Sequence, residues 1–74
     1  MSNLSNRLIE LKNSRNLLQK QIAEDTNISL RAYQYYEKNQ RFPTSDTLIK
    51  LADYFDVSTD YLLGRTDNPN SHKL

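Results

Sequence analysis

Apolar side chains recur along this chain with the period of an α-helix, in segments separated by short polar runs. Leu4, Leu8 and Leu11 stand four and three residues apart, which predicts one buried stripe on a first helix. Asn3 or Ser2 is placed to cap that helix. Weak helix formers predict where it ends, at Asn13, Ser14 and Asn16.

A second, short helix is predicted from Leu18 to Asp25, with Ile22 and Ala23 facing inward. The pair Thr26–Asn27 is expected to break it. We expect Asn27 to adopt the left-handed conformation, because Asn tolerates a positive φ better than most residues other than Gly.

Three further helices follow from capping residues and apolar spacing. Ser29 is expected to cap a helix from Leu30 to Glu37, and Thr44 or Ser45 to cap a fourth helix. The apolar stripe of that fourth helix is Leu48, Leu51, Ala52 and Phe55. Ser58 is placed to cap a short fifth helix that Gly64 ends. The pattern predicts an all-α, compact five-helix domain over residues 1–64, followed by a flexible polar tail over residues 65–74.

Composition limits the function classes. A chain of 74 residues without cysteine has room for one small domain and offers no thiolate ligands for a metal. Its only histidine, His72, lies in the predicted tail, and no Gly-rich phosphate loop or catalytic set is visible. We therefore expect no enzyme activity, metal, cofactor or small-molecule ligand. Without a signal-peptide pattern or a long apolar run, we also expect no membrane and a cytoplasmic location.

The net charge of +1 is divided unevenly along the chain. Residues 1–42 carry seven Lys and Arg against four Asp and Glu, whereas residues 43–64 carry one Lys against four Asp. One interpretation is a basic face for a polyanion and an acidic face turned away from it. The other is ordinary solvated charge.

Residues 19–36 have the layout of a helix-turn-helix, with a small Ala23 at the crossing point and Asn27 in the turn. The spacing of the whole chain resembles the lambda-repressor-like, Cro or XRE-type family of helix-turn-helix regulators. The matching positions are Arg7-Leu8-x-x-Leu11-Lys12, Leu17-x-Gln19-x-x-Ile22-Ala23, Ile28-Ser29, Tyr36-Glu37, Arg41-x-Pro43-x-x-x-Thr47-Leu48-x-Lys50-Leu51-Ala52 and Val57-Ser58-x-Asp60-x-Leu62-Leu63. The resemblance implies that helices two and three form the DNA-reading unit, from Gln19 to Glu37.

The chain departs from the family pattern at three positions. Asn27 stands where Gly is usual, and Leu18 replaces the usual Thr, so the second helix is expected to lack a side-chain cap. Tyr33 occupies a core position usually held by Ile or Val, which requires its ring inside and its hydroxyl at the edge.

Four positions point outward from the third helix by helical spacing and match the family's base-reading residues: Leu30, Arg31, Gln34 and Tyr35. Arg31 is suited to guanine, Gln34 to adenine and Leu30 to a thymine methyl group. The alternative interpretation is a solvated helix face.

Five residues are candidate phosphate contacts, Gln19, Ser29, Lys38, Gln40 and Arg41, although any of them can serve solubility alone. The resemblance also implies that Gln19 braces the third helix. It further implies a structural salt bridge between Lys12 and Glu37.

A homodimer is expected, because one short helix contacts too few bases for useful specificity. Tyr61, Leu62 and Leu63 are consecutive on a short helix, so at least one must point away from the core. We expect the three to form the dimer interface, extended by Phe55 and Val57. The alternative is that Tyr61 is a lone surface aromatic on a monomer.

The expected function is sequence-specific binding of double-stranded DNA, as a bacterial or phage-type repressor on a pseudo-palindromic operator. The alternative is a protein-interaction module with the same fold, acting as an antitoxin-like or anti-repressor partner. Arg31 and Gln34 favour DNA, whereas Leu30 and Tyr35 also suit a protein partner.

Overall fold

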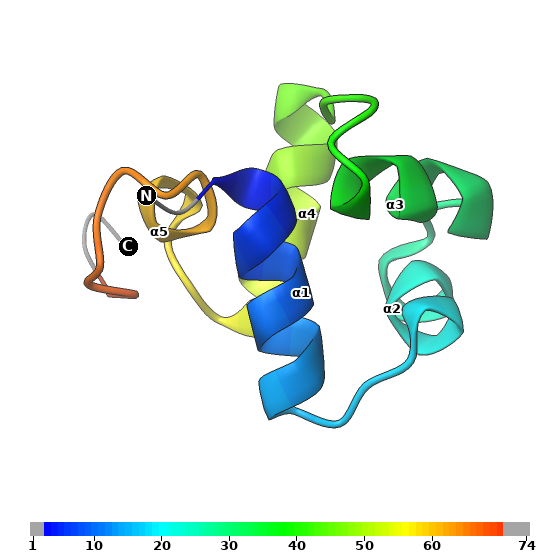
Figure 1. The fold of residues 1–74 in the computed structure, drawn as a ribbon, viewed down its shortest axis with the longest axis horizontal. Helices are drawn as coiled ribbons and strands as arrows, with labels where there is room; N and C mark the ends of the chain where they lie inside the picture. The colour runs from blue at the N-terminus through cyan, green and yellow to red at the C-terminus, as the bar shows by residue number, and fades with distance from the viewer. Residues whose placement is uncertain (1–2, 71–74) are drawn as a thin grey trace.

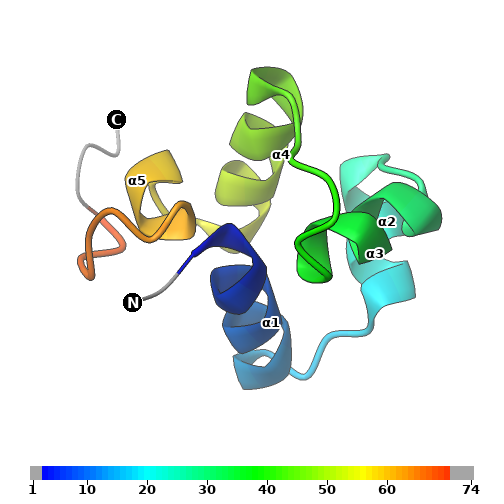
Figure 2. The ribbon, with the colours of Figure 1, turned by 45° about the horizontal axis from the view of Figure 1, so that its top comes forward.

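The described part of the chain folds into five helices joined by short loops. The computed structural model describes residues 3–70, and within them the helices are α1 (Leu4–Ser14), α2 (Gln19–Thr26), α3 (Leu30–Glu37), α4 (Ser45–Phe55) and α5 (Thr59–Leu62). α2 and α3 lie at one end of the molecule, α5 at the other, with α1 and α4 between them (Figures 1 and 2). The all-α, five-helix expectation is confirmed. Within residues 3–70, no helix is long and apolar enough to cross a membrane.

Side chains at the helix starts explain where most of the helices begin. Asn3, Ser29, Thr44 and Ser58 each accept a hydrogen bond from a backbone N–H in the first turn of the helix that follows. α2 is the exception, because the residue before it is Leu18 and no side chain caps it. Both the caps and the missing cap agree with the sequence analysis. The bounds of α2 differ by one residue, since Leu18 is outside the helix and Thr26 inside it.

Four residues other than glycine follow helix ends in the left-handed region: Asn16, Asn27, Asn39 and Asp56. Asn27 has φ 59° and ψ 36°, so its predicted conformation is confirmed. Short polar side chains tolerate this region because they hydrogen-bond locally. The turns at α1, α2, α3 and α4 therefore form without glycine.

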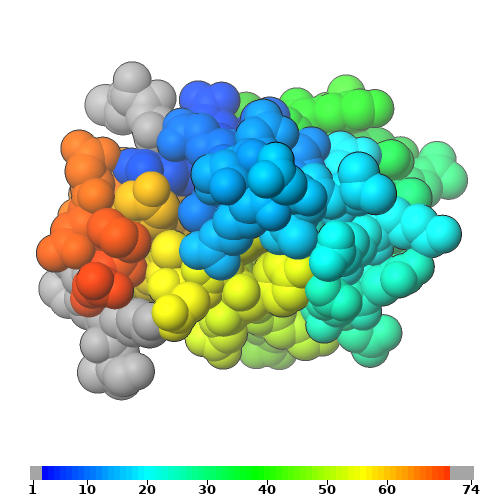
Figure 3. Space-filling view, turned by 90° about the horizontal axis from the view of Figure 1, so that it is seen from below, coloured from blue at the N-terminus to red at the C-terminus, as the bar shows by residue number. Residues whose placement is uncertain are grey.

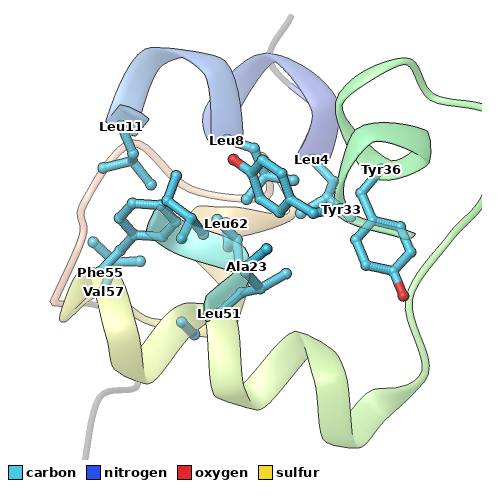
Figure 4. Packing of buried hydrophobic residues seen from close by; sticks show 12 residues of the cluster. Leu4, Leu8, Leu11, Ala23, Tyr33, Tyr36, Leu51, Phe55, Val57 and Leu62 are labelled. Atoms are coloured by element: carbon cyan, nitrogen blue, oxygen red, sulfur yellow. The ribbon is translucent and has the colours of Figure 1, made fainter. Parts of the chain in front are cut away.

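The core is formed by apolar side chains from all five helices. Its buried members are Leu4, Leu8, Leu11, Ile22, Ala23, Tyr33, Tyr36, Leu51, Ala52, Phe55, Val57 and Leu62. α1 packs on α3 and α5, while α4 packs on α2 and α5, so one cluster connects both ends of the molecule. In Figure 4 the ring of Tyr33 lies inside this cluster, whereas the hydroxyl of Tyr36 points away from it.

The surroundings of Tyr33 correct one expectation. Its ring is inside as predicted, but its hydroxyl is not at the edge, because the whole residue is 0% exposed. The hydroxyl makes no hydrogen bond within residues 3–70. Burial, and after it the nearby Glu37, raise the pKa of Tyr33 far above its ordinary value. Tyr33 therefore stays neutral while it is folded.

The α5 end also differs from expectation. α5 has four residues, and Leu62 is 0% exposed because it packs in the core between α1 and α4. Phe55 and Val57, expected to extend an exposed patch, are buried as well. Leu62, Phe55 and Val57 are therefore core residues and not surface residues. Tyr61 and Leu63 are half-buried.

Residues after α5 turn back onto the domain. The buried guanidinium of Arg7 lies 3.9 Å from the ring centroid of Tyr61 and donates to the backbone oxygen of Thr66 at 3.2 Å. It also pairs with the Asp67 carboxylate at 2.8 Å. The backbone N–H of Ser58 donates to the carbonyl of Pro69. In the space-filling view this segment, orange to red, lies at the α5 end, away from α2 (Figure 3).

The flexibility expected for residues 65–74 remains a prediction. Residues 71–74, which include His72, lie outside the described residues. Within residues 3–70, no group of three or more His, Asp or Glu side chains is placed to hold a metal ion.

Candidate nucleic-acid interface

One face of α3 is open to solvent and carries the four residues expected to read bases. Leu30 is 39% exposed, Arg31 is exposed, and Gln34 and Tyr35 are half-buried. The opposite face of the same helix buries Tyr33 and Tyr36 in the core. Because the buried residues fix the rotation of α3, the other four share the outer side. We call these four residues the α3 surface.

Tyr35 contacts two arginines at this surface. The guanidinium carbon of Arg31 lies 5.8 Å from the centroid of the Tyr35 ring, and that of Arg41 lies 5.0 Å from it. Both distances fall within the range of a cation–π interaction. The Nε of Arg31 also donates to the Tyr35 hydroxyl at 3.2 Å. The helix and the loop after it are thus joined through one ring.

That loop presents the remaining polar candidates. Lys38, Gln40 and Arg41 are exposed, and the loop turns sharply because Asn39 has φ 59°. The backbone N–H of Gln40 donates to the carbonyl of Tyr35 at 3.0 Å, which fixes the turn to the helix. Phe42 is 62% exposed directly after Arg41. The sequence analysis did not single out Phe42, and its exposure alone does not make it a contact residue.

Gln19 connects α2 to the α3 surface. Its Oε1 accepts from the Nε2 of Gln34 at 3.2 Å, and its own Nε2 donates to Glu37 Oε1 at 3.0 Å. Gln19 therefore makes two hydrogen bonds to α3 from the first residue of α2. This geometry can perform the bracing role that the family resemblance implies.

Glu37 ties α3 to the rest of the domain. Its Oε1 lies 3.0 Å from the Nζ of Lys12 on α1, in the ion pair that the resemblance implies. Its backbone carbonyl also accepts a hydrogen bond from the hydroxyl of Ser5. Glu37 is buried and Lys12 is 17% exposed, so removing either partner would leave a poorly solvated charge.

The charge around the α3 surface is positive. Glu37 is the only acidic residue between positions 27 and 45, and it is buried against Lys12. The same stretch carries three exposed cations, Arg31, Lys38 and Arg41. The exposed carboxylates of the described residues are on Glu10, Glu24, Asp25, Asp46, Asp53, Asp56 and Asp67, and among them Glu24 lines a hollow with Ser29 and Leu30. This surface therefore attracts anions, and its Gln and Arg side chains have the hydrogen-bonding groups that base edges require.

The candidate residues form two separate groups. At the α3 end, Gln34 is hydrogen-bonded to Gln19, and Tyr35 contacts both Arg31 and Arg41. Ser29, Lys38 and Gln40 lie at the two ends of the same helix. The expected dimer residues lie at the other end of the molecule (Figure 1), and only Tyr61 and Leu63 among them reach the surface.

Comparisons with known proteins agree with this architecture. The family model described as helix-turn-helix matches residues 8–62. The chain is 42% identical over 64 residues to the HTH-type transcriptional regulator ImmR of Bacillus subtilis, covering 86% of this chain and 50% of that protein. It is 34% identical over 71 residues to the cryptic phage CTXphi transcriptional repressor RstR of Vibrio cholerae, covering 96% of this chain and 63% of that protein.

A crystal structure of a transcriptional regulator from Listeria innocua superposes with a TM-score of 0.78 at 37% identity. The match covers 84% of this chain and 58% of that one. This chain thus spans between half and two thirds of the length of these relatives. The relatives are named as regulators and not as enzymes, as the sequence analysis expects. From its fold, its motif positions and these matches, the chain belongs to the Cro/XRE-type helix-turn-helix family of transcriptional regulators.

Proposed function

We propose that this chain binds double-stranded DNA in a sequence-dependent way and places α3 in the major groove. The observation that carries the proposal is the α3 surface itself. It combines exposed Arg31 and half-buried Gln34, while the carboxylate of Glu37, on the same helix, is turned inward and paired with Lys12. A major-groove reader needs such cationic and amide groups on the exposed face of a helix that its own core holds rigidly.

Three members of the α3 surface have a base edge that suits their chemistry. Arg31 can donate two hydrogen bonds to guanine O6 and N7, and Leu30 can pack on a thymine methyl group. One N–H of the Gln34 amide is used by Gln19, which leaves the amide oxygen and the second N–H for an adenine edge. Gln19 thereby holds Gln34 in place before DNA arrives.

Phosphate contacts would fix the orientation of α3 in the groove. Ser29 stands at the start of the helix, and Lys38, Gln40 and Arg41 follow its end. Groups at both ends of a helix can reach the two strands that border the groove. Gln19, at the start of α2, completes the set of proposed phosphate contacts. DNA binding also implies a cytoplasmic location.

We further propose repression by a homodimer on a pseudo-palindromic operator. Repression is supported by the name of the Vibrio cholerae relative, and the dimer by the small number of bases that one eight-residue helix can reach. The half-buried Leu63 and Tyr61 are the proposed dimer contacts. Leu63→Glu is the cleaner test, because a Glu at position 61 would lie beside Arg7. It should abolish cooperative operator binding and leave the helical circular-dichroism signal unchanged.

Selection of binding sites from a pool of random duplexes tests the central proposal. A short, two-fold-related consensus is expected, with log K falling by about 0.9 per neutralised phosphate for each unit of log salt. Affinity that is independent of salt, or selection without any consensus, would contradict sequence-specific DNA binding.

The second candidate is a protein-interaction module, and the exposed apolar side chains Leu30 and Phe42 near the same surface favour it. A gel shift with random duplexes at low salt separates the two functions. Non-specific retardation is expected of a DNA binder, and none is expected of a module that binds only protein.

A further inference from the structure

The half-buried ring of Tyr35 gathers two positive charges at the DNA-facing end of the molecule. Arg31 comes from the first turn of α3, and Arg41 comes from the loop after the helix. Their guanidinium carbons lie 5.8 and 5.0 Å from the same ring centroid, and Arg31 also donates to the ring's hydroxyl. Two like charges that share one ring repel each other, so the ring must supply part of what keeps them there.

These two charges remain available for an external anion. Within residues 3–70, the ion pairs Arg7–Asp67, Lys12–Glu37 and Arg65–Asp60 involve neither of these two arginines. Glu37, the acidic residue of α3, is buried and pairs with Lys12 of α1. A polyanion that approaches the α3 surface would therefore meet both guanidinium groups together and relieve their mutual repulsion.

Holding the arginines in place has a consequence for binding. A free arginine side chain loses much of its rotational freedom when it contacts a ligand, and an aromatic support reduces that loss in advance. The support also sets where one arginine lies relative to the other. Because Arg31 is placed for a base and Arg41 for a phosphate, a fixed relation between them fixes how α3 is registered in the groove.

We propose that Tyr35 is a positioning residue that holds Arg31 and Arg41 in their DNA-contacting arrangement and does not itself read a base. This inference rests on the proposed DNA binding. It assigns to Tyr35 a different role from the base reading that the family resemblance implies.

Two substitutions separate the parts of this role. Tyr35→Phe keeps the ring and removes only the acceptor for Arg31, so it should lower the preference for the selected site over random duplex about threefold to tenfold. Its salt dependence should stay unchanged. Tyr35→Leu removes the support for both arginines. It should weaken binding to both kinds of duplex and reduce the slope of log K against log salt by about 0.9 per protomer, the value for one phosphate contact.

The effect of Tyr35→Leu with and without the two arginines distinguishes a positioning role of Tyr35 from a direct base contact. In the Arg31→Ala, Arg41→Ala background, Tyr35→Leu should cause no further loss of affinity, because the groups that it holds are gone. A loss as large as in the wild-type background would overturn the proposal and make Tyr35 a direct DNA contact. Phe42→Leu is the matched control, since it makes the same aromatic-to-leucine change at a neighbouring exposed ring. Its effect on affinity should be the same in the wild-type and in the Arg31→Ala, Arg41→Ala background.

A measurement without DNA tests the arrangement itself. In the NMR spectrum of the free protein, the Hε signals of Arg31 and Arg41 should be displaced by the Tyr35 ring, and Tyr35→Leu should return them to ordinary positions. Undisplaced signals in the wild-type protein would overturn the inference whether or not DNA binds. Displaced signals in a wild-type protein that retains no duplex would instead contradict the proposed function, and with it the role of Tyr35 in DNA recognition.

Discussion

The two ends of this domain carry similar apolar and aromatic side chains but use them differently. At the α3 end, an eight-residue helix buries Tyr33 and Tyr36 and leaves a whole face outside. At the α5 end, a four-residue helix buries Leu62, and Arg7 lies against the ring of Tyr61. A helix needs about two turns before its buried and exposed faces are separate surfaces. Helix length therefore decides which end can present a broad recognition surface.

Replacing neighbouring leucines of the α5 end gives the largest expected effect. Leu62→Ala should lower the free energy of unfolding by about 2 to 5 kcal/mol, because it opens a cavity in the core. Leu63→Ala should cost much less, since Leu63 is only half-buried. Urea unfolding followed by circular dichroism measures both. Equal losses would mean that the α5 end is not divided into a core side and a surface side.

Local patterns predicted the α3 end better than the α5 end. The conformation of Asn27 and the cap at Ser29 depend on the residue itself and its neighbours in sequence, so they could be read directly. The burial of Leu62 depends on where α1 and α4 place their side chains, which three consecutive apolar residues do not reveal. The burial of Arg7 could have been predicted, because its spacing from Leu4 and Leu11 places this cation on an apolar stripe.

Only one of the two arginine contacts of Tyr35 could be predicted from the sequence. The spacing of Arg31 and Tyr35 by four residues allowed their contact, since such pairs are neighbours on a helix. Arg41 contacts the same ring from the loop after α3, in which Asn39 has a positive φ. A sequence pattern predicts which residues share a helix face, but it does not predict which loop residues contact that face.

Removing the cation from the α3 surface gives the next largest expected effect. Arg31→Ala should weaken specific DNA binding by about 1 to 3 kcal/mol and relax the preference at one base position. The stability of the free protein should change little, since Arg31 is exposed. Fluorescence anisotropy with specific and random duplexes checks this. An equal loss on both duplexes would make Arg31 a phosphate contact.

A smaller effect is expected from the buried arginine at the α5 end. Arg7→Ala should lower the free energy of unfolding by about 1 to 2 kcal/mol, through lost contact with the Tyr61 ring and lost packing of the aliphatic stem. Asp67→Asn should have a much smaller effect, because the Asp67 side chain is fully exposed. Thermal unfolding of the two variants compares them directly. If Asp67→Asn destabilises as strongly as Arg7→Ala, the ion pair outweighs the ring contact.

The smallest effect near neutral pH concerns Tyr33, which has no counterpart at the α5 end. Tyr33→Phe should change stability at pH 7 by less than about 1 kcal/mol, because it removes a hydroxyl without a hydrogen bond and keeps the ring. The difference in stability between the wild-type protein and the variant should appear at alkaline pH. The raised pKa keeps folded Tyr33 neutral, whereas an unfolded tyrosine ionises near pH 10. The wild-type protein therefore loses stability as the pH rises past about 10, and the variant lacks that part of the loss.

Urea unfolding at pH 7 and near pH 11 measures this difference, and the other four tyrosines, common to both proteins, provide the control. A parallel decline in the two proteins would mean that Tyr33 ionises as readily in the folded chain as in the unfolded chain.

The hydrogen bond from Ser58 to Pro69 and the contacts of Arg7 with Thr66 and Asp67 hold residues 66–69 against the α5 end. α1 begins near the same end, and α3 lies at the opposite end (Figure 1). A fluorophore, an affinity handle or a fused protein joined after residue 70 would thus start its path on the side of the molecule that faces away from a duplex bound to α3. The same point of attachment leaves the α3 surface unobstructed for surface immobilisation.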